Sequence, residues 1–281
     1  MTIDAVLRDA QTFLAGYINN SEAKLEAQLL LQNLLKVNRA WLISHQNDTL
    51  QPNIHAAYMA LVNRRANGEP IAYIIGMREF YGLSLKVTPA TLIPRPDTET
   101  LVDAALAKIP LHKNLSICDL GTGTGAIALA IARHRPQASV LALDTSQAAL
   151  DVAIENAENL KISNVKFAVS NWFSILGQEK FDFIVSNPPY IEANDTHLSQ
   201  GDLRFEPISA LASGQDGLDD IRDIISQAPQ YLNAPGWLLL EHGYNQAEQV
   251  AALLKQAGFS QISHTQDLAE INRVTSGCIG Q

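Results

Sequence analysis

The first seventy residues carry apolar side chains at intervals of three and four, which is the spacing of one face of an α-helix. This spacing predicts a helix over residues 3–17 and a second one capped by Ser21. A short third helix holds Trp41, and a fourth is opened by Pro52 and closed by Gly68. We therefore predict a small N-terminal helical bundle.

Beyond the bundle the spacing changes. Residues 78–87 alternate between polar and apolar around Gly82, which predicts a β-hairpin linking two domains. After Pro96, strand and helix patterns alternate, which predicts a doubly wound, mainly parallel α/β sheet of Rossmann-like type with helices on both faces. Its ligands should bind at the carboxyl ends of the strands. The predicted strands cover residues 115–120, 139–143, 165–169, 181–186, 237–241 and 259–263, with a closing strand at 273–279.

These patterns divide the chain into a helical domain over 1–75, a hairpin linker over 76–92 and an α/β domain over 93–281. Residues 191–217 carry few helix or strand signals, and a loop of this length in a compact domain is usually functional or mobile.

Composition narrows the possible functions. The hydrophobic fraction of 47% excludes a disordered chain, and a net charge of -9 disfavours non-specific binding to DNA or RNA. Two cysteines form no disulfide framework, so we expect a reducing, cytoplasmic location. We expect no signal peptide and no membrane span, and the seven histidines lack metal-ligand spacing, so no metal is expected.

A glycine-rich loop follows the first predicted strand of the α/β domain. Its residues are Gly121, Thr122, Gly123, Thr124 and Gly125, and a helix begins directly after them. Glycines allow a tight turn and a close approach to outward-pointing backbone amides, which suits a nucleotide-like ligand. The Gly-x-Gly-x-Gly spacing favours a ligand without a pyrophosphate. The alternative is a strand-to-helix turn without a ligand.

Polar and aromatic residues follow the next two strands. Asp144 lies about 20 residues beyond the glycines, where a carboxylate can accept hydrogen bonds from ribose hydroxyls. It can also cap the following helix. Asn171 can meet an adenine amino group, and Trp172 can cover the adenine ring or fill the core.

Asn187, Pro188, Pro189 and Tyr190 follow the apolar strand over 181–186 and form the sharpest motif. The prolines remove two N–H donors and leave carbonyl oxygens without a local partner. Asn187 Oδ1 and the Pro188 carbonyl can therefore hold both N–H groups of a planar nitrogen, and Tyr190 can pack on its π face. The alternative is a rigid proline turn. If the motif does hold a planar nitrogen, positioning of the two reactants would supply most of the rate enhancement, and no strong general base would be needed.

Together these motifs resemble class I S-adenosylmethionine-dependent methyltransferases acting on planar nitrogens. Three further segments, at residues 79–82, 92–99 and 201–218, narrow the resemblance to the HemK/PrmC family over nearly the whole chain. The resemblance implies methylation of the glutamine side chain in the Gly-Gly-Gln motif of class I peptide chain release factors. S-adenosyl-L-methionine would be the donor and S-adenosyl-L-homocysteine the product.

The resemblance also implies roles for single residues. Asn187 would touch cofactor and substrate, Pro188, Pro189 and Tyr190 would frame the glutamine, and the helical domain would recognise the release factor. Residues 95–99 would flank the methionine end of the cofactor, although a helix start capped by Thr98 or Asp97 explains them nearly as well. The implied cofactor contacts are Gly121, Thr122, Gly123, Thr124, Gly125, Asp144, Trp172 and Asn187.

The chain departs from the family pattern in two places and leaves three rival functions open. Asn171 occupies a position at which the family often has Asp. The C-terminal segment 269–274 lacks the glycine that the family often has before its Arg-Val pair, which is Arg273 and Val274 here. The rivals are a glutamine methyltransferase for a ribosomal protein, an amino-methyltransferase for DNA bases, and a binding module without catalysis. The net charge of -9 speaks against the DNA enzyme.

Overall fold

The computed structural model describes residues 1–280, and their contacts form two compact units. The helical unit comprises Met1–Met77 together with Gln200–Phe205. The α/β unit comprises Arg78–Ser199 and the chain from Glu206 onward. The chain therefore returns once to the helical unit in the middle of the long loop that follows Tyr190.

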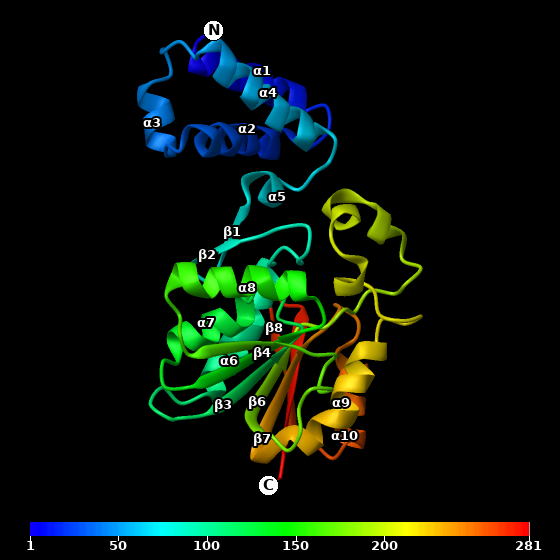
Figure 1. Ribbon diagram of the computed structural model, residues 1–281. Coiled ribbons are helices and arrows are strands. Elements are labelled where there is room, and N and C mark those ends of the chain that lie inside the picture. Colours follow the sequence, from blue (N-terminus) through cyan, green and yellow to red (C-terminus); the bar gives the residue numbers. More distant parts are fainter. Residues whose placement is uncertain (281) are drawn as a thin grey trace. The chain divides into compact units, whose positions relative to one another are not determined.

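The five helices of the helical unit (Figure 1) all contribute buried residues to one apolar core. Its second helix is capped by Asn19 and not by Ser21, because Asn19 Oδ1 accepts hydrogen bonds from Glu22 N (2.9 Å) and Ser21 Oγ (2.7 Å). Both residue types cap helices well, so the sequence alone did not separate them. The helices are α1 (Ile3–Leu14), α2 (Asn20–Leu35), α3 (Arg39–Ser44), α4 (Pro52–Ala66) and α5 (Ile71–Ile75).

Arg65 holds the returning segment within the helical unit. This largely buried arginine donates from Nε to Glu26 Oε2 at 2.6 Å and pairs with Asp202 Oδ1 at 3.4 Å. Arg204 adds a hydrogen bond from Nη2 to the Asn67 carbonyl at 3.0 Å. Burial raises the pKa of Glu26 even though Arg65 opposes that shift. The pair is therefore sensitive to the loss of either partner.

We expect Arg65→Met to lower the free energy of unfolding of the helical unit by about 3 kcal/mol, because it leaves Glu26 buried without its cation. The double variant Glu26→Leu/Arg65→Met should recover most of this loss. Hydrogen exchange of the amides in α2 and α4 during urea unfolding measures both effects. Equal exchange in Arg65→Met and the wild type would contradict the expectation.

The α/β unit contains the hairpin and a seven-stranded sheet in the order β5-β4-β3-β6-β7-β9-β8. Neighbouring strands are parallel from β5 to β7, and β9 runs antiparallel to β7 and β8. The predicted mainly parallel sheet is confirmed, including the closing strand. The strands are β1 (Met77–Phe80) and β2 (Leu83–Lys86) in the hairpin, and β3 (Ser116–Leu120), β4 (Ser139–Asp144), β5 (Val165–Val169), β6 (Phe181–Ser186), β7 (Leu232–Glu241), β8 (Ser260–Gln266) and β9 (Asn272–Ile279).

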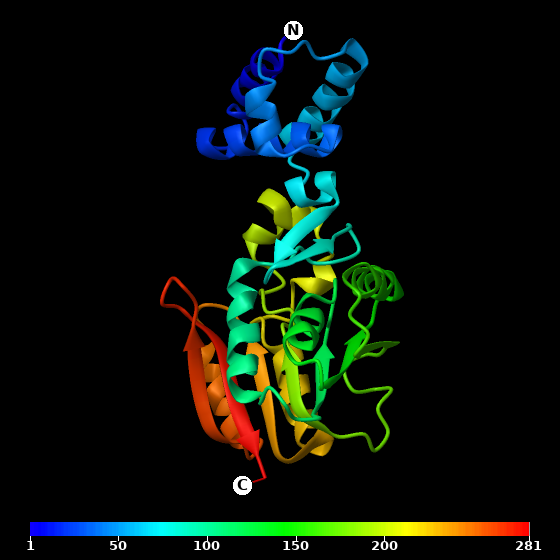
Figure 2. The same cartoon turned by 90° about the vertical axis from the view of Figure 1, so that its left-hand side faces the viewer.

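Helices cover both faces of this sheet (Figure 2). Alternate residues of one strand enter opposite cores: Ile117 of β3 packs with α6 and α7, whereas Cys118 packs with α9 and α10. The order of strands reverses between β3 and β6, and ligands of such sheets bind where it does. The helices are α6 (Glu99–Lys108), α7 (Ala126–His134), α8 (Gln147–Leu160), α9 (Asp219–Tyr231) and α10 (Ala247–Gln256).

The loop over residues 191–217 holds three 3-10 turns: η2 (Thr196–Ser199), η3 (Gly201–Phe205) and η4 (Ile208–Ala210). Within residues 1–280, no helix has the length and apolar character to cross a bilayer, and no cluster of potential metal ligands occurs.

Candidate functional site

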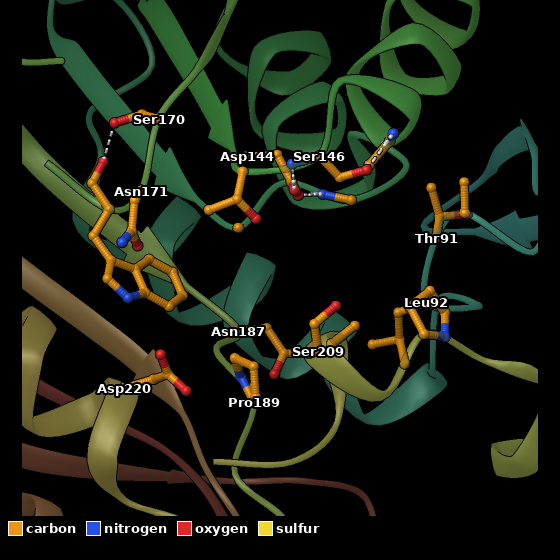
Figure 3. A pocket seen from close by; sticks show the side chains of 18 residues that line it. Thr91, Leu92, Asp144, Ser146, Ser170, Asn171, Asn187, Pro189, Ser209 and Asp220 are labelled. Carbon is orange, nitrogen blue, oxygen red and sulfur yellow. Dashed lines mark hydrogen bonds between the residues drawn. The ribbon is translucent and has the colours of Figure 1, made fainter. Parts of the chain in front are cut away.

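A cavity of about 220 Å³ opens at the carboxyl ends of the central strands of the α/β unit (Figure 3). The predicted motifs meet there although they lie far apart in the sequence. A smaller cavity of about 50 Å³ shares Gly121, Gly123 and Asn187 with it and extends to Thr98. The larger cavity is lined by residues from the glycine loop, the ends of β4, β5 and β6, and the η4 turn, among them Gly121, Gly123, Asp144, Asn171, Trp172, Asn187, Pro189, Ser209 and Asp220.

The glycine loop is held in place by hydrogen bonds to the strands β3 and β4. The amides of Gly121 and Thr122 both donate to the Leu143 carbonyl, and Thr122 Oγ1 donates to Asp119 Oδ2 at 2.6 Å. A Cβ on Gly121 would lie 3.4 Å from the Trp172 ring, at a backbone φ of +73° that favours glycine. The loop is therefore held rigidly, and its residues Thr122 and Thr124, although largely buried, line the smaller cavity.

Asp119 is a buried acid that the sequence analysis did not assign. Its Oδ2 accepts from Thr122 and from the Ala128 amide, whereas Oδ1 has no hydrogen-bond partner within the described residues. Burial raises the pKa of Asp119 to about 7. The carboxyl joins the end of β3 to the start of α7 and so fixes the glycine turn between them.

Asp144 lies at the tip of β4 beside the glycine loop. Its Oδ2 accepts from the Gly123 amide at 2.9 Å, and its Oδ1 accepts from the Ser146 amide at 2.9 Å. The cap of α8 is Ser146, whose hydroxyl accepts from the Ala149 amide. The helix-cap role considered for Asp144 is therefore wrong, and its carboxylate faces the cavity (Figure 3).

Asn171 and Trp172 both line the cavity. Asn171 is exposed, and Trp172 is half-buried with a backbone φ of +47°, which is unfavourable for a residue with a side chain. This backbone turns the indole toward Gly121, where the missing Cβ leaves room for it. Such strain persists only where the surroundings impose it, and it marks Trp172 as part of the site.

Asn187 is half-buried at the end of β6 and borders both cavities. Its Nδ2 donates to Thr98 Oγ1 at 3.2 Å. No hydrogen bond from residues 1–280 reaches the Pro188 carbonyl, as expected of an acceptor left open by the two prolines. Pro189 lines the larger cavity.

Tyr190 turns toward the protein interior. Its hydroxyl donates to Glu241 Oε1 at 3.4 Å, and its ring packs against the core beside α9 and α10. Burial raises the pKa of this hydroxyl. Neither Tyr190 nor Pro188 lines the larger or the smaller cavity.

Within residues 95–99, Pro96–Thr98 form the 3-10 turn η1, and α6 begins directly after it. Arg95 forms an ion pair with Glu206, which also accepts from the Ile93 amide at 2.9 Å. A helix does start here, and Thr98 is the N-cap residue of α6 by position, but its side chain makes no capping hydrogen bond.

Glu241 is the second acid that the sequence analysis left out of the site. It ends β7, is fully buried, and burial raises its pKa to about 7. Its Oε2 has no hydrogen-bond partner within the described residues. An acid at the end of the apolar stretch 237–241 was the available signal, but only the strand order brings it beside Asn187.

Comparison with known proteins gives consistent matches along the chain. Residues 5–76 match the model of the PrmC N-terminal domain, and residues 111–275 match a methyltransferase domain. The chain is 50% identical over 254 residues to a release factor glutamine methyltransferase from Xylella fastidiosa, covering 90% of this chain and 92% of that one. It is 48% identical over 278 residues to a protein of the same name from Vibrio cholerae, covering 99% and 96%.

A similar solved structure is a methyltransferase from Pyrococcus furiosus, with a TM-score of 0.54 and 18% sequence identity. It covers 78% of this chain and 98% of its own. At this identity the likeness concerns the fold alone.

Proposed function

Because the chain belongs to the family of release factor glutamine methyltransferases, we propose that it methylates the glutamine of the Gly-Gly-Gln motif in class I peptide chain release factors. The enzyme is a methyltransferase that uses S-adenosyl-L-methionine and releases S-adenosyl-L-homocysteine. The observation that carries the proposal is that Asn187, the expected amide acceptor, borders the same cavity as the glycine loop and Asp144.

The residues of the cavity fit this cofactor. Asp144 can accept from the ribose hydroxyls, and Trp172 and Asn171 can bind the adenine. The amides of the glycine loop and the smaller cavity beside Thr98 can take the methionine end. When bound, the cofactor supplies an electrophilic methyl group on a sulfonium sulfur.

The substrate clamp consists of two acceptors. Asn187 Oδ1 and the Pro188 carbonyl can each accept one N–H of the glutamine amide, which leaves the π face of the nitrogen free for attack. Pro189 closes one side, and Tyr190 holds the backbone of the motif through its contact with Glu241. Holding both reactants in this geometry can contribute up to about 7–11 kcal/mol of the barrier reduction.

The chain needs no strong base for this reaction. The new N–C bond forms while the S–CH₃ bond breaks, and the alkylated amide is then far more acidic than the starting one. Its excess proton can pass to solvent through the open cavity. Asp119 and Glu241 are both buried and do not line the larger cavity, so neither is assigned as the base.

The helical domain over 1–75 is proposed to grip the release factor, with the hairpin over 76–92 as its link to the methyltransferase domain over 93–281. The enzyme would act in the cytoplasm, where its two buried cysteines stay reduced. A ribosomal-protein substrate is the second candidate, and a DNA substrate is disfavoured by the net charge of -9.

The test is incubation of the enzyme with labelled S-adenosyl-L-methionine and one of three substrates: a release factor, a ribosomal protein or duplex DNA. We expect label in the release factor alone, and mass spectrometry should locate one methyl group on its glutamine. Label confined to the ribosomal protein or to DNA would replace the proposed substrate.

For the cofactor site, we expect Asp144→Ala to weaken binding of S-adenosyl-L-homocysteine about 10- to 100-fold, because a charge-assisted hydrogen bond is lost. Isothermal titration calorimetry measures the change. Asp151→Ala is the matched control, since Asp151 is an exposed acid on α8 whose side chain accepts a hydrogen bond from Gln147 and from no other residue of the described chain 1–280. Equal affinities for the two variants would refute the role of Asp144.

A further inference from the structure

Asp220 is an acid in the first turn of α9, and its side chain lines the larger cavity. It is half-buried, and none of the hydrogen bonds or ion pairs among residues 1–280 involves its carboxylate. Figure 3 shows this carboxylate pointing into the cavity from the side on which Pro189 lies. The cavity therefore contains a hydrogen-bond acceptor that the fold itself does not use.

The neighbouring acids of Asp220 are used within the fold. Asp216 and Asp219 both form ion pairs with Arg222 of α9. Asp219 is exposed and lines neither cavity. An acid in the first turn of a helix stabilises the helix through its dipole, and Asp219 meets that need as well as Asp220 does. Helix stability therefore does not explain why Asp220 faces the cavity.

Two contacts fasten the start of α9 to the Asn-Pro-Pro-Tyr motif. Gln246 Nε2 donates to the carbonyls of Tyr190 at 3.1 Å and Asp216 at 3.3 Å, and so bridges the two segments. Gly217 packs so closely on the motif that a Cβ there would lie 2.2 Å from the Tyr190 carbonyl oxygen. Asp220 follows Gly217 by three residues, so its position is fixed relative to the proposed clamp.

The group that meets Asp220 must be a donor, because a carboxylate only accepts hydrogen bonds. The larger cavity is lined by no lysine or arginine of the described chain. The ribose hydroxyls of the cofactor are proposed to bind Asp144, and the adenine to bind Asn171 and Trp172, all at the β4 and β5 end of the sheet. This leaves the substrate as the source of the donor.

The Gly-Gly-Gln motif offers only two kinds of donor. The N–H groups of the glutamine amide are proposed to bind Asn187 Oδ1 and the Pro188 carbonyl. The glycines have no side chains, so the other donors are main-chain N–H groups, which glycine lets approach another group closely. A main-chain N–H of the motif is therefore the partner that remains for Asp220.

We propose that Asp220 is a substrate-binding residue whose carboxylate accepts a hydrogen bond from a main-chain N–H of the Gly-Gly-Gln segment. This inference rests on the proposed function. It adds a third contact to the clamp, since Asn187 and Pro188 hold the side-chain amide while Asp220 holds the backbone that carries it. Holding the glutamine at both ends limits its rotation before methyl transfer.

The test is steady-state methylation of the release factor by Asp220→Ala and Asp220→Asn in the full chain. Alanine removes a charge-assisted hydrogen bond, so we expect KM for the release factor to rise about 10- to 100-fold while kcat stays within about threefold. Asparagine keeps a carbonyl acceptor without the charge, so its KM should lie between those of the wild type and Asp220→Ala.

Asp219→Ala is the matched control, because it removes the adjacent acid from the same turn of α9 and leaves the cavity lining unchanged. We expect its KM and kcat to stay within about threefold of the wild type. The affinity for S-adenosyl-L-homocysteine, measured by calorimetry, should also stay within about threefold in all three variants, since the proposed cofactor contacts are untouched.

A second measurement separates a main-chain partner from a charged side chain. The lysines and arginines of the release factor within about five residues of Gly-Gly-Gln are replaced by alanine, and KM is measured again with the wild type and Asp220→Ala. We expect the same KM ratio within about threefold, because the main-chain N–H groups remain. A ratio that fell to one would show that Asp220 pairs with a cationic side chain, and would overturn the inference.

Three further outcomes would overturn the inference. One is a wild-type KM in Asp220→Ala, and another is a loss confined to kcat, which would place Asp220 in the methyl-transfer step. The third is a loss of cofactor affinity in Asp220→Ala that Asp219→Ala does not share, which would assign Asp220 to the cofactor. A wild-type enzyme that leaves the release factor unmethylated would instead refute the proposed function.

Discussion

Asn187→Ala should lower the rate of release factor methylation by at least about 1,000-fold while the protein keeps its fold. The substitution removes Oδ1, one of the two acceptors proposed to hold the glutamine amide, and with it the orientation of the nucleophile. It also frees Thr98, whose hydroxyl loses the Nδ2 donor at 3.2 Å. The rate is measured by mass spectrometry of the release factor at saturating cofactor.

Asn171→Ala provides the control for this prediction. It is the same substitution in the same cavity, but Asn171 lies after β5, where the adenine is expected, and its side chain is exposed. Its loss should raise the cofactor concentration needed for half-maximal rate and leave the rate at saturation within about threefold. If Asn187→Ala behaved like Asn171→Ala, the clamp would have been assigned to the wrong residue.

The elements of the α/β unit were predictable because each strand is bounded by a change of period or by a turn. Residues 165–169 and 181–186 were predicted with the observed ends, as β5 and β6. β7 starts at Leu232, five residues before the predicted start at Trp237. Pro235 and Gly236 are unfavourable in strands, so local propensity favours the later start. The sequence shows the strand propensity of each residue. Where β7 begins depends instead on its pairing with β6, in which Leu232 lies opposite Phe181.

The site was predictable where its residues follow one another in the sequence, and not where they meet only in the fold. The glycine loop and the Asn187–Tyr190 motif each occupy a few consecutive positions. Thr98 and Glu241 lie 89 residues before and 54 residues after Asn187, and only the strand order β6-β7 and the turn before α6 join the three. Contacts of this range are a property of the topology, which a local pattern does not contain.

The helical unit should matter for the substrate and not for the cofactor. It has its own apolar core, separate from the two cores of the sheet, and the residues of both cavities belong to the α/β unit. We therefore expect a chain that begins at Gly76 to bind S-adenosyl-L-homocysteine within about threefold of the full-length affinity.

The same truncation should lower kcat/KM for the release factor at least about 100-fold. If the helical unit contributes an interface of its own, removing it removes the binding free energy that brings the glutamine to Asn187. Cofactor binding by calorimetry serves as the folding control for the truncated chain, because an unfolded chain would have no affinity. A truncated enzyme that bound cofactor and kept the full-length KM for the release factor would show that recognition lies in the α/β unit. In that case the loop over residues 191–217, which begins directly after Tyr190, would be the next region to test for the substrate contact.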